Sequence, residues 1–282
     1  MDSHSNAEHT QVEDVSEFIQ EMAKALTAFR NVLVEWTPTI QHALSAMSNA
    51  ASALLTAIQQ MQLSSYSKEE LDDLNSRYTA WGKYGWTLYP LTLDEEFQTI
   101  PETLQQADDL ALSSYTEESI SDLYEEILRC SNVLKDDFEE AYSEYSSGKY
   151  RVCALILFSL VERCLITTQS LDPSMRENRK VSGGGVKNFS RQLNSTHSAN
   201  MFIYVWLLET NVLACLEAVY QSSPNFQHEP DLINRHFIEH GMSNRKTTKT
   251  ECIKLFLLYY NILFLSEWIE SQPPYSNQSK EV

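Results

Sequence analysis

Apolar residues recur at steps of three and four positions through most of this chain, which has 282 residues. This is the period of an amphipathic α-helix, whereas no stretch alternates as a half-buried β-strand does. The chain also holds only 7 Gly and 8 Pro, too few turn-forming residues for a many-stranded sandwich or barrel. The pattern therefore predicts an all-α fold, built as a helical bundle.

The first part of the chain is expected to form a helical hairpin. Residues 12–36 and 38–61 each carry a helical apolar stripe, and Thr37-Pro38 ends one helix and begins the next. A short acidic helix should follow over residues 65–80, since Ser67 and Glu70 have the spacing of a capping box. The aromatic segment 81–90 should then turn the chain and bury its rings.

The second part is expected to form the larger bundle, with helices over residues 116–145, 150–169, 199–220, 231–240 and 247–270. The helix over 150–169 is apolar on nearly all sides, which is typical of the centre of a bundle. Residues 171–196 are expected to form an irregular, mobile and basic loop, because they contain the glycines 183–185.

Charge is divided unevenly along the chain. Residues 1–148 hold 27 acidic and 7 basic side chains, whereas residues 149–254 hold 13 basic and 9 acidic ones. The net charge of −18 argues against a general polyanion binder, but the positive balance of the second segment leaves RNA open as a partner. The acidic segment is either an ordinary solvated surface or a surface for a basic or regulatory protein.

These patterns divide the chain into three parts. We expect an acidic helical N-terminal region over residues 1–112, a helical domain over 113–272 and a disordered tail over 273–282. The first ten residues are polar, so they do not resemble a signal peptide. The most apolar run covers residues 255–265, too short to cross a bilayer core of about 30 Å. Five cysteines without a CxxC pair indicate free thiols and no cysteine-based zinc site. A cytoplasmic protein with no membrane contact is expected.

The densest polar cluster lies in residues 231–241. Arg235, His236, Glu239 and His240 fall within six residues on a short expected helix that ends at Gly241. In one interpretation they are ordinary surface positions of a capped helix. In a second, His236 and His240 are zinc ligands with Glu239 as general base, because the H-x-x-E-H pattern of inverted zinc proteases is present.

A third interpretation rests on a resemblance. Arg235 and His240 have the R-x4-H spacing of the HEPN superfamily of small helical ribonuclease-like domains, and the polar His236 directly follows the arginine. Gly148-Lys149-Tyr150 and the apolar helix after it resemble the central helix of bacterial members. The segment from Asn234 through Gly241, with the helix that follows, resembles their motif and terminal helix. The resemblance covers about residues 116–270.

Membership in that superfamily implies RNA cleavage without a metal or other cofactor. His240 would transfer a proton between the ribose 2′-hydroxyl and the leaving 5′-oxygen, and Arg235 would hold the phosphate. Asn234 and His236 would orient these groups or contact RNA, and Glu162 would pair with Arg235 or His236. Members commonly dimerise, so a homodimer is implied. Basic side chains expected to contact RNA are Arg176, Arg179, Lys180, Lys187, Arg245 and Lys246.

The sequence therefore predicts a metal-independent endoribonuclease that leaves 2′,3′-cyclic phosphate ends, with a toxin-like or phage-defence role by family analogy. The alternative from another class is a non-catalytic helical interaction or regulatory protein. A zinc hydrolase that uses His236 and His240 is the third hypothesis.

Overall fold

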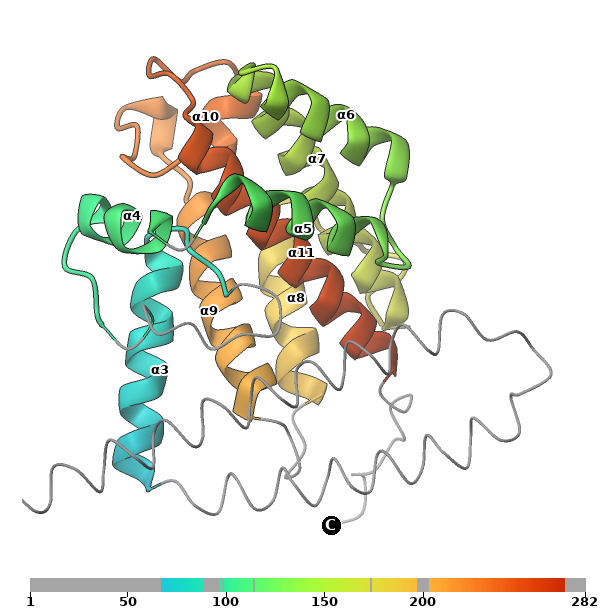
Figure 1. Cartoon of the computed structure of the whole chain (residues 1–282). Coiled ribbons are helices and arrows are strands. Elements are labelled where there is room, and N and C mark those ends of the chain that lie inside the picture. Colours follow the sequence, from blue (N-terminus) through green and yellow to red (C-terminus); the bar gives the residue numbers. More distant parts are fainter. Residues whose placement is uncertain are drawn as a thin grey trace, which may run out of the picture.

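The computed structural model describes residues 67–88, 97, 99–113, 115–172, 174–196 and 203–271, and these residues form an all-α bundle without strands. The expected hairpin over 12–36 and 38–61 and the tail over 273–282 lie outside the described residues. The described helices, labelled as in Figure 1, are α3 (Lys68–Lys83), α4 (Leu104–Leu112), α5 (Glu117–Leu128), α6 (Lys135–Ser146), α7 (Tyr150–Thr168), α8 (Ser182–Thr196), α9 (Ile203–Val219), α10 (Arg235–Glu239) and α11 (Lys249–Ser271). Two short 3-10 turns, Gln169–Leu171 and Pro224–Phe226, follow α7 and α9.

Helix α11 is the centre of this bundle. It crosses the molecule diagonally (Figure 1) and packs against α5, α7, α8 and α9. Its residues are buried almost without interruption from Glu251 to Leu263. Helix α7 is also largely apolar, but one of its faces lies open to solvent, with Val152 42% and Leu155 37% exposed. The predicted central helix over 150–169 is therefore correct as a helix but is not enclosed on all sides.

Two segments are long and apolar enough to cross a membrane by length and composition alone: Tyr150–Leu171 and α11. Most of each apolar window, 56% and 83% respectively, is buried inside the bundle. Core helices of globular proteins pass the same test, so this is weak evidence for a membrane span.

The aromatic segment begins in the last turn of α3, and its two tryptophans are buried, as predicted. Trp81 and Trp86 are 0% and 1% exposed, and Gly85 turns the chain between them with a φ of 84°. The Asn211 side chain on α9 holds the segment, because its amide donates to the carbonyl oxygens of Tyr78 and Trp86 and its oxygen accepts from the backbone N–H of Leu88. Buried backbone groups that leave a helix need such partners.

One hydrophobic core runs across the domain boundary expected at residues 112 and 113. Side chains of α3, including Tyr78 and Trp81, belong to the same buried cluster as those of α7, α9 and α11. A buried ion pair adds to this connection, since Lys254 Nζ of α11 lies 2.5 Å from Asp108 Oδ1 of α4. All five cysteines are buried in this core and none forms a disulfide.

The single long helix predicted over 116–145 is wrong, because the structure breaks it into α5 and α6. Side chains of α11 bind the polar groups of the turn between these two helices. Glu267 accepts from the backbone N–H and the hydroxyl of Ser131, and Glu270 accepts from the side chain of Asn132. Separate helices can tilt so that both Leu123 and Phe138 are buried. The contacts that favour the break come from residues far along the chain.

The irregular loop predicted over 171–196 is also wrong in its second half, where α8 begins at Ser182 and includes all three glycines. Val186, Phe189 and Leu193 form the buried stripe of this helix, and burial of such a stripe outweighs the low helix propensity of glycine. Gly185 also permits close packing, since a Cβ there would lie 3.2 Å from the carbonyl oxygen of Lys180.

The α3–α9 contact depends on Gly82. A Cβ at this position would lie 2.3 Å from the Asn211 carbonyl oxygen and 2.8 Å from the Ala214 Cβ. We expect Gly82→Ala to lower the free energy of unfolding by about 3 kcal/mol, because the two helices must separate. Gly183→Ala is the matched control, since a Cβ there meets nothing within 4 Å. Thermal and urea unfolding followed by circular dichroism measure both variants; equal stability of the two would contradict this account.

Candidate functional site

The predicted cluster of polar residues is built on the short helix α10. Asn234 caps this helix, because its side-chain oxygen accepts from the backbone N–H of Phe237 at 3.3 Å. Its amide donates to the carbonyl oxygen of Gln221 at 2.8 Å, which ties the helix start to the chain leaving α9. Phe237 and Ile238 are buried beneath, and Gly241 ends the helix with a φ of 68°. These contacts fix where the remaining α10 side chains point.

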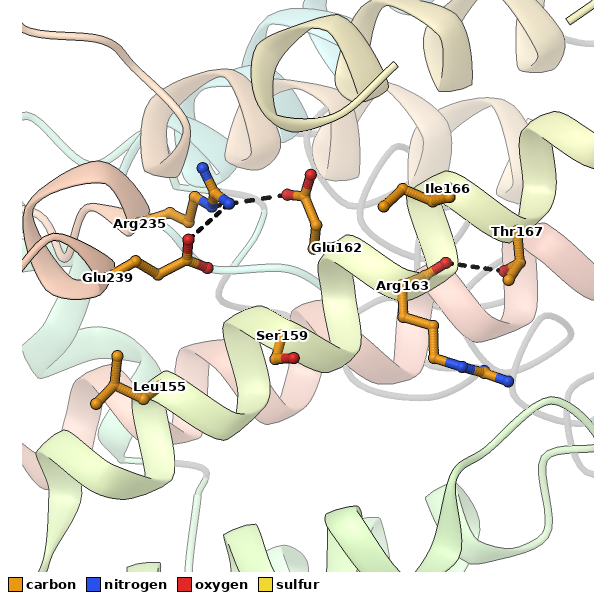
Figure 2. A pocket seen from close by; sticks show the side chains of 8 residues that line it. All are labelled: Leu155, Ser159, Glu162, Arg163, Ile166, Thr167, Arg235 and Glu239. Atoms are coloured by element: carbon orange, nitrogen blue, oxygen red, sulfur yellow. Dashed lines mark hydrogen bonds and ion pairs between the residues drawn. The ribbon is translucent and has the colours of Figure 1, made fainter. Parts of the chain in front are cut away.

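The polar side chains of α10 leave on two different faces. Residues four positions apart share a helix face, so Arg235 lies with Glu239, and His236 lies with His240. Arg235 and Glu239 point toward α7 (Figure 2). The two histidines lie against Phe226 instead. One chain therefore does not bring Arg235 and His240 into direct contact, although both leave the same short helix.

A pocket of about 540 Å³ lies between α7 and α10. Figure 2 shows its lining, with Arg235 and Glu239 on one side and a run of α7 side chains on the other. The α7 residues are Leu155, Ser159, Glu162, Arg163, Ile166 and Thr167. The pocket lining therefore combines two apolar side chains, two hydroxyls and four charged groups.

Arg235 lies between two carboxylates in this pocket. Its Nη2 is 2.6 Å from Glu239 Oε2, and its Nε is 3.6 Å from Glu162 Oε2. A third group, the Ser182 hydroxyl at the start of α8, accepts from Arg235 Nη1 at 3.2 Å. The predicted pairing of Glu162 with Arg235 is thus present, and the predicted alternative with His236 is not the one formed. The two carboxylates hold the guanidinium group of Arg235 in place and also compensate its positive charge.

Glu162 is the more deeply buried of the two carboxylates, at 9% exposure. Its Oε1 accepts from the backbone N–H of Ser182, so the same side chain pairs with Arg235 and caps α8. Tyr220 lies beside this group, with Arg235 over its ring at 5.8 Å. Burial, together with the negative charge of Glu162, raises the pKa of Tyr220 well above its ordinary value. The phenol therefore stays protonated at neutral pH.

Glu239 is the more exposed partner of Arg235. Burial raises the pKa of its carboxyl above the ordinary value, Arg235 opposes that shift, and the charge of Glu162 adds to it. Two carboxylates that share one guanidinium repel one another. The less buried of them, Glu239, is therefore the one that a competing anion can replace.

Phe226, His236 and His240 form a ring cluster on the other face of α10. Phe226 and His236 are stacked with centroids 4.2 Å apart and an interplanar angle of 7°. His240 meets His236 edge-on at 4.8 Å and Phe226 at 5.6 Å. Phe226 and His236 are half-buried, and His240 is exposed.

The backbone that delivers Phe226 to this cluster is strained. Asn225 and Phe226 both have a φ of 55°, in the left-handed region. Asn tolerates this region, but a bulky residue there is an outlier that costs on the order of 1–3 kcal/mol. A stacked aromatic pair returns about 0.5–1.5 kcal/mol. Stacking on His236 alone thus contributes little net stability to the fold.

The zinc hypothesis has few suitable ligands in this geometry. His236 and His240 do lie together, but the Glu239 carboxylate is turned toward Arg235 and paired with it. Among the described residues, no group of three or more His, Cys, Asp or Glu side chains is placed to hold a metal ion.

The basic residues predicted to contact RNA fall into two groups. Arg176, Arg179 and Lys180 are exposed on the segment that leads into Ser182, and Lys187 is exposed on α8. The guanidinium groups of Arg176 and Arg179 donate to oxygens of Ser170. Arg245 is instead paired with Glu229 and Glu251. Lys246 is exposed beside it. Arg176, Arg179 and Lys180 thus precede Ser182, whose hydroxyl accepts from Arg235, whereas the charge of Arg245 is already compensated.

Several site residues were not predicted. Arg163 lines the pocket from α7, and Arg191 is exposed one turn after Lys187. A charge in an otherwise apolar helix is a usable signal for Arg163. Ser182, Tyr220 and Phe226 reach the site only through tertiary packing, which a single sequence does not reveal.

Protein-family models, curated proteins and solved structures contain no match to this chain.

The pKa of the His236 ring should lie below the ordinary value for histidine. Burial lowers its pKa below the ordinary 6.5, and the charges of His240 and Arg235 lower it further. As pH falls through 6.5, the unfolded chain therefore binds this proton before the folded chain does, and folding stability is lost. We expect NMR titration of the imidazole C–H signals to give this low value, and His240→Gln to raise it by removing a positive neighbour. A His236 pKa at or above 6.5 would contradict the burial described here.

Proposed function

We propose that this chain is a metal-independent endoribonuclease of the HEPN type. The observation that carries the proposal is the placement of Arg235 and His240 by one capped helix, with Arg235 in a pocket and His240 exposed at the helix end. The two residues have the spacing expected for that superfamily, and the surrounding fold is all-α.

The chemistry fits the residue types. An exposed imidazole can take the proton from a ribose 2′-hydroxyl, whose oxygen then attacks the adjacent phosphorus. The bond from phosphorus to the 5′-oxygen breaks, and an imidazolium gives that oxygen a proton. A guanidinium group can hold the phosphate oxygens through two donors and stabilise their developing charge. The products are a 2′,3′-cyclic phosphate and a 5′-hydroxyl. No cofactor is required.

We place the reaction between two copies of the chain. Arg235 and His240 leave α10 on different faces. A second copy of the chain can therefore place its His240 next to Arg235 of the first copy. Exposed apolar side chains favour such a dimer, because Val152 and Leu155 lie on the open face of α7, and Met242, three residues after the end of α10, has 44% of its surface exposed. Arg151 of α7 bonds the carbonyl oxygen of Ser243, which joins these segments.

RNA would reach this site along basic side chains. Arg176, Arg179 and Lys180 precede Ser182, which bonds Arg235, and Arg163 lines the pocket itself. Lys187 and Arg191 continue the exposed positive charge along α8. Phosphate contacts of this kind position the strand without reading its sequence.

The proposal is tested by separate Arg235→Lys and His240→Ala variants with labelled RNA in EDTA. Lysine keeps the charge of Arg235 but loses its fork-shaped donors, and it leaves Glu162 a partner. We expect cleavage rates to fall about 100-fold or more in each variant, with cyclic phosphate ends on the wild-type products. Matched controls are Arg129→Lys, whose side chain pairs with Glu126 on α5, and His228→Ala, which is exposed.

Cleavage that persists in both variants would overturn the assigned residues. Activity that vanishes in EDTA and returns with zinc would favour the metal hydrolase. A wild-type chain that folds and does not cleave RNA, yet captures a protein partner, would favour the interaction module.

Glu239 should restrain the activity, because it occupies the face of Arg235 that a phosphate must approach. Glu239→Gln removes one negative charge while the amide oxygen can still accept from Arg235. We expect the affinity for single-stranded RNA to rise about fivefold, equivalent to about 1 kcal/mol. Glu125→Gln makes the same charge change on α5, which contributes nothing to the pocket. An equal gain in both variants would mean that only net charge matters.

A further inference from the structure

The ring cluster of Phe226, His236 and His240 has a surface that the ion pairs at Arg235 do not use. Phe226 is half-buried and His240 is exposed, so ring surface remains open to solvent. Two exposed amide side chains, Asn225 and Gln227, flank Phe226 in the sequence. The strained backbone at residues 225 and 226 places the Phe226 ring between His236 and the edge-on ring of the buried Phe237, on a half-exposed surface.

We infer that the ring cluster is a stacking platform for one unpaired RNA base, next to the nucleotide whose phosphate meets Arg235. The inference rests on the proposed function and deepens it, because it names the substrate class as single-stranded RNA. Every base has a π-face that can stack on an aromatic ring, whereas a base inside a duplex has both faces covered.

Three features of the cluster suit this ligand. Phe226 and His236 already form a near-parallel stack, with an interplanar angle of 7°, and a base could continue such a stack. His236 is mainly uncharged at neutral pH, since burial lowers its pKa. The amides of Asn225 and Gln227 offer both donors and acceptors to the edge of a bound base. His236 and Arg235 are adjacent residues that leave α10 on two faces, so a strand that crosses this helix would place a base on the cluster and a neighbouring phosphate at Arg235.

Binding to uncleavable strands tests the platform separately from catalysis. The probes are a fluorescent 2′-O-methyl single strand, the same backbone with abasic positions, and the corresponding duplex. We expect Phe226→Leu to weaken binding of the complete strand about tenfold and to leave binding of the abasic strand unchanged. Phe226→Tyr should restore the wild-type affinity, and Phe264→Leu, at a half-buried ring on α11, should change nothing.

A second measurement does not depend on any variant. A strand that carries a fluorescent adenine analogue should lose emission when the wild-type chain binds it, because stacking quenches the analogue. Unchanged emission on binding would overturn the platform. The platform would also be overturned if Phe226→Leu weakened binding of the complete strand and of the abasic strand equally. It would likewise be overturned if Phe226→Leu lost the dimer while its binding of the strands stayed unchanged.

The outcomes separate the two proposals. If wild type and Phe226→Leu cleave and bind RNA equally, the ribonuclease stands and the platform falls. If base-dependent binding requires Phe226 but no cleavage occurs, the platform stands and the chain is an RNA-binding module. Absence of both binding and cleavage in the wild type overturns both.

Discussion

The Glu162 carboxylate is the constraint on which the site depends. It is nine-tenths buried on α7, and a buried carboxylate is tolerated only when charged or hydrogen-bonding groups surround it. The first turn of α8 and the side chain of Arg235 meet that need together. The positions of α8 and α10 relative to α7 are therefore coupled through one side chain. The same contact draws Arg235 into an ion pair, so the feature that organises the pocket also lowers the free charge in it.

Helical periodicity was sufficient to predict α3, α7, α9 and α11 and the absence of strands from the described residues. The Ser67–Glu70 capping box was predicted and is present, because it depends on residues three apart. The break between α5 and α6 depends on Glu267 and Glu270, more than a hundred positions away. Helix α8 forms despite its glycines because Phe189 and its neighbours find a core to enter. Neither the break between α5 and α6 nor the burial of α8 can be inferred from the residues of those segments alone.

The sequence was sufficient to predict which residue types make up the candidate site. It was less informative about how their side chains are placed relative to one another. The R-x4-H spacing selects Arg235 and His240, but five residues on a helix turn the side chains about 140° apart. Glu239 occupies the position that shares a face with Arg235, which explains why an acidic residue, and not the histidine, contacts the guanidinium group. Phe226 reaches α10 from a separate loop, so its stacking on His236 follows from tertiary structure alone.

The five buried thiols have a practical consequence for chemical labelling. Burial raises the pKa of Cys164 and Cys215 to about 12, and thiolates are the reactive form toward maleimides. Cys130, Cys153 and Cys252 are enclosed in the same way, and the chain has no others. A single cysteine placed at an exposed position such as Lys187 would thus be the accessible one in the folded chain. Spectroscopic probes could be attached to α8 without first replacing the native cysteines.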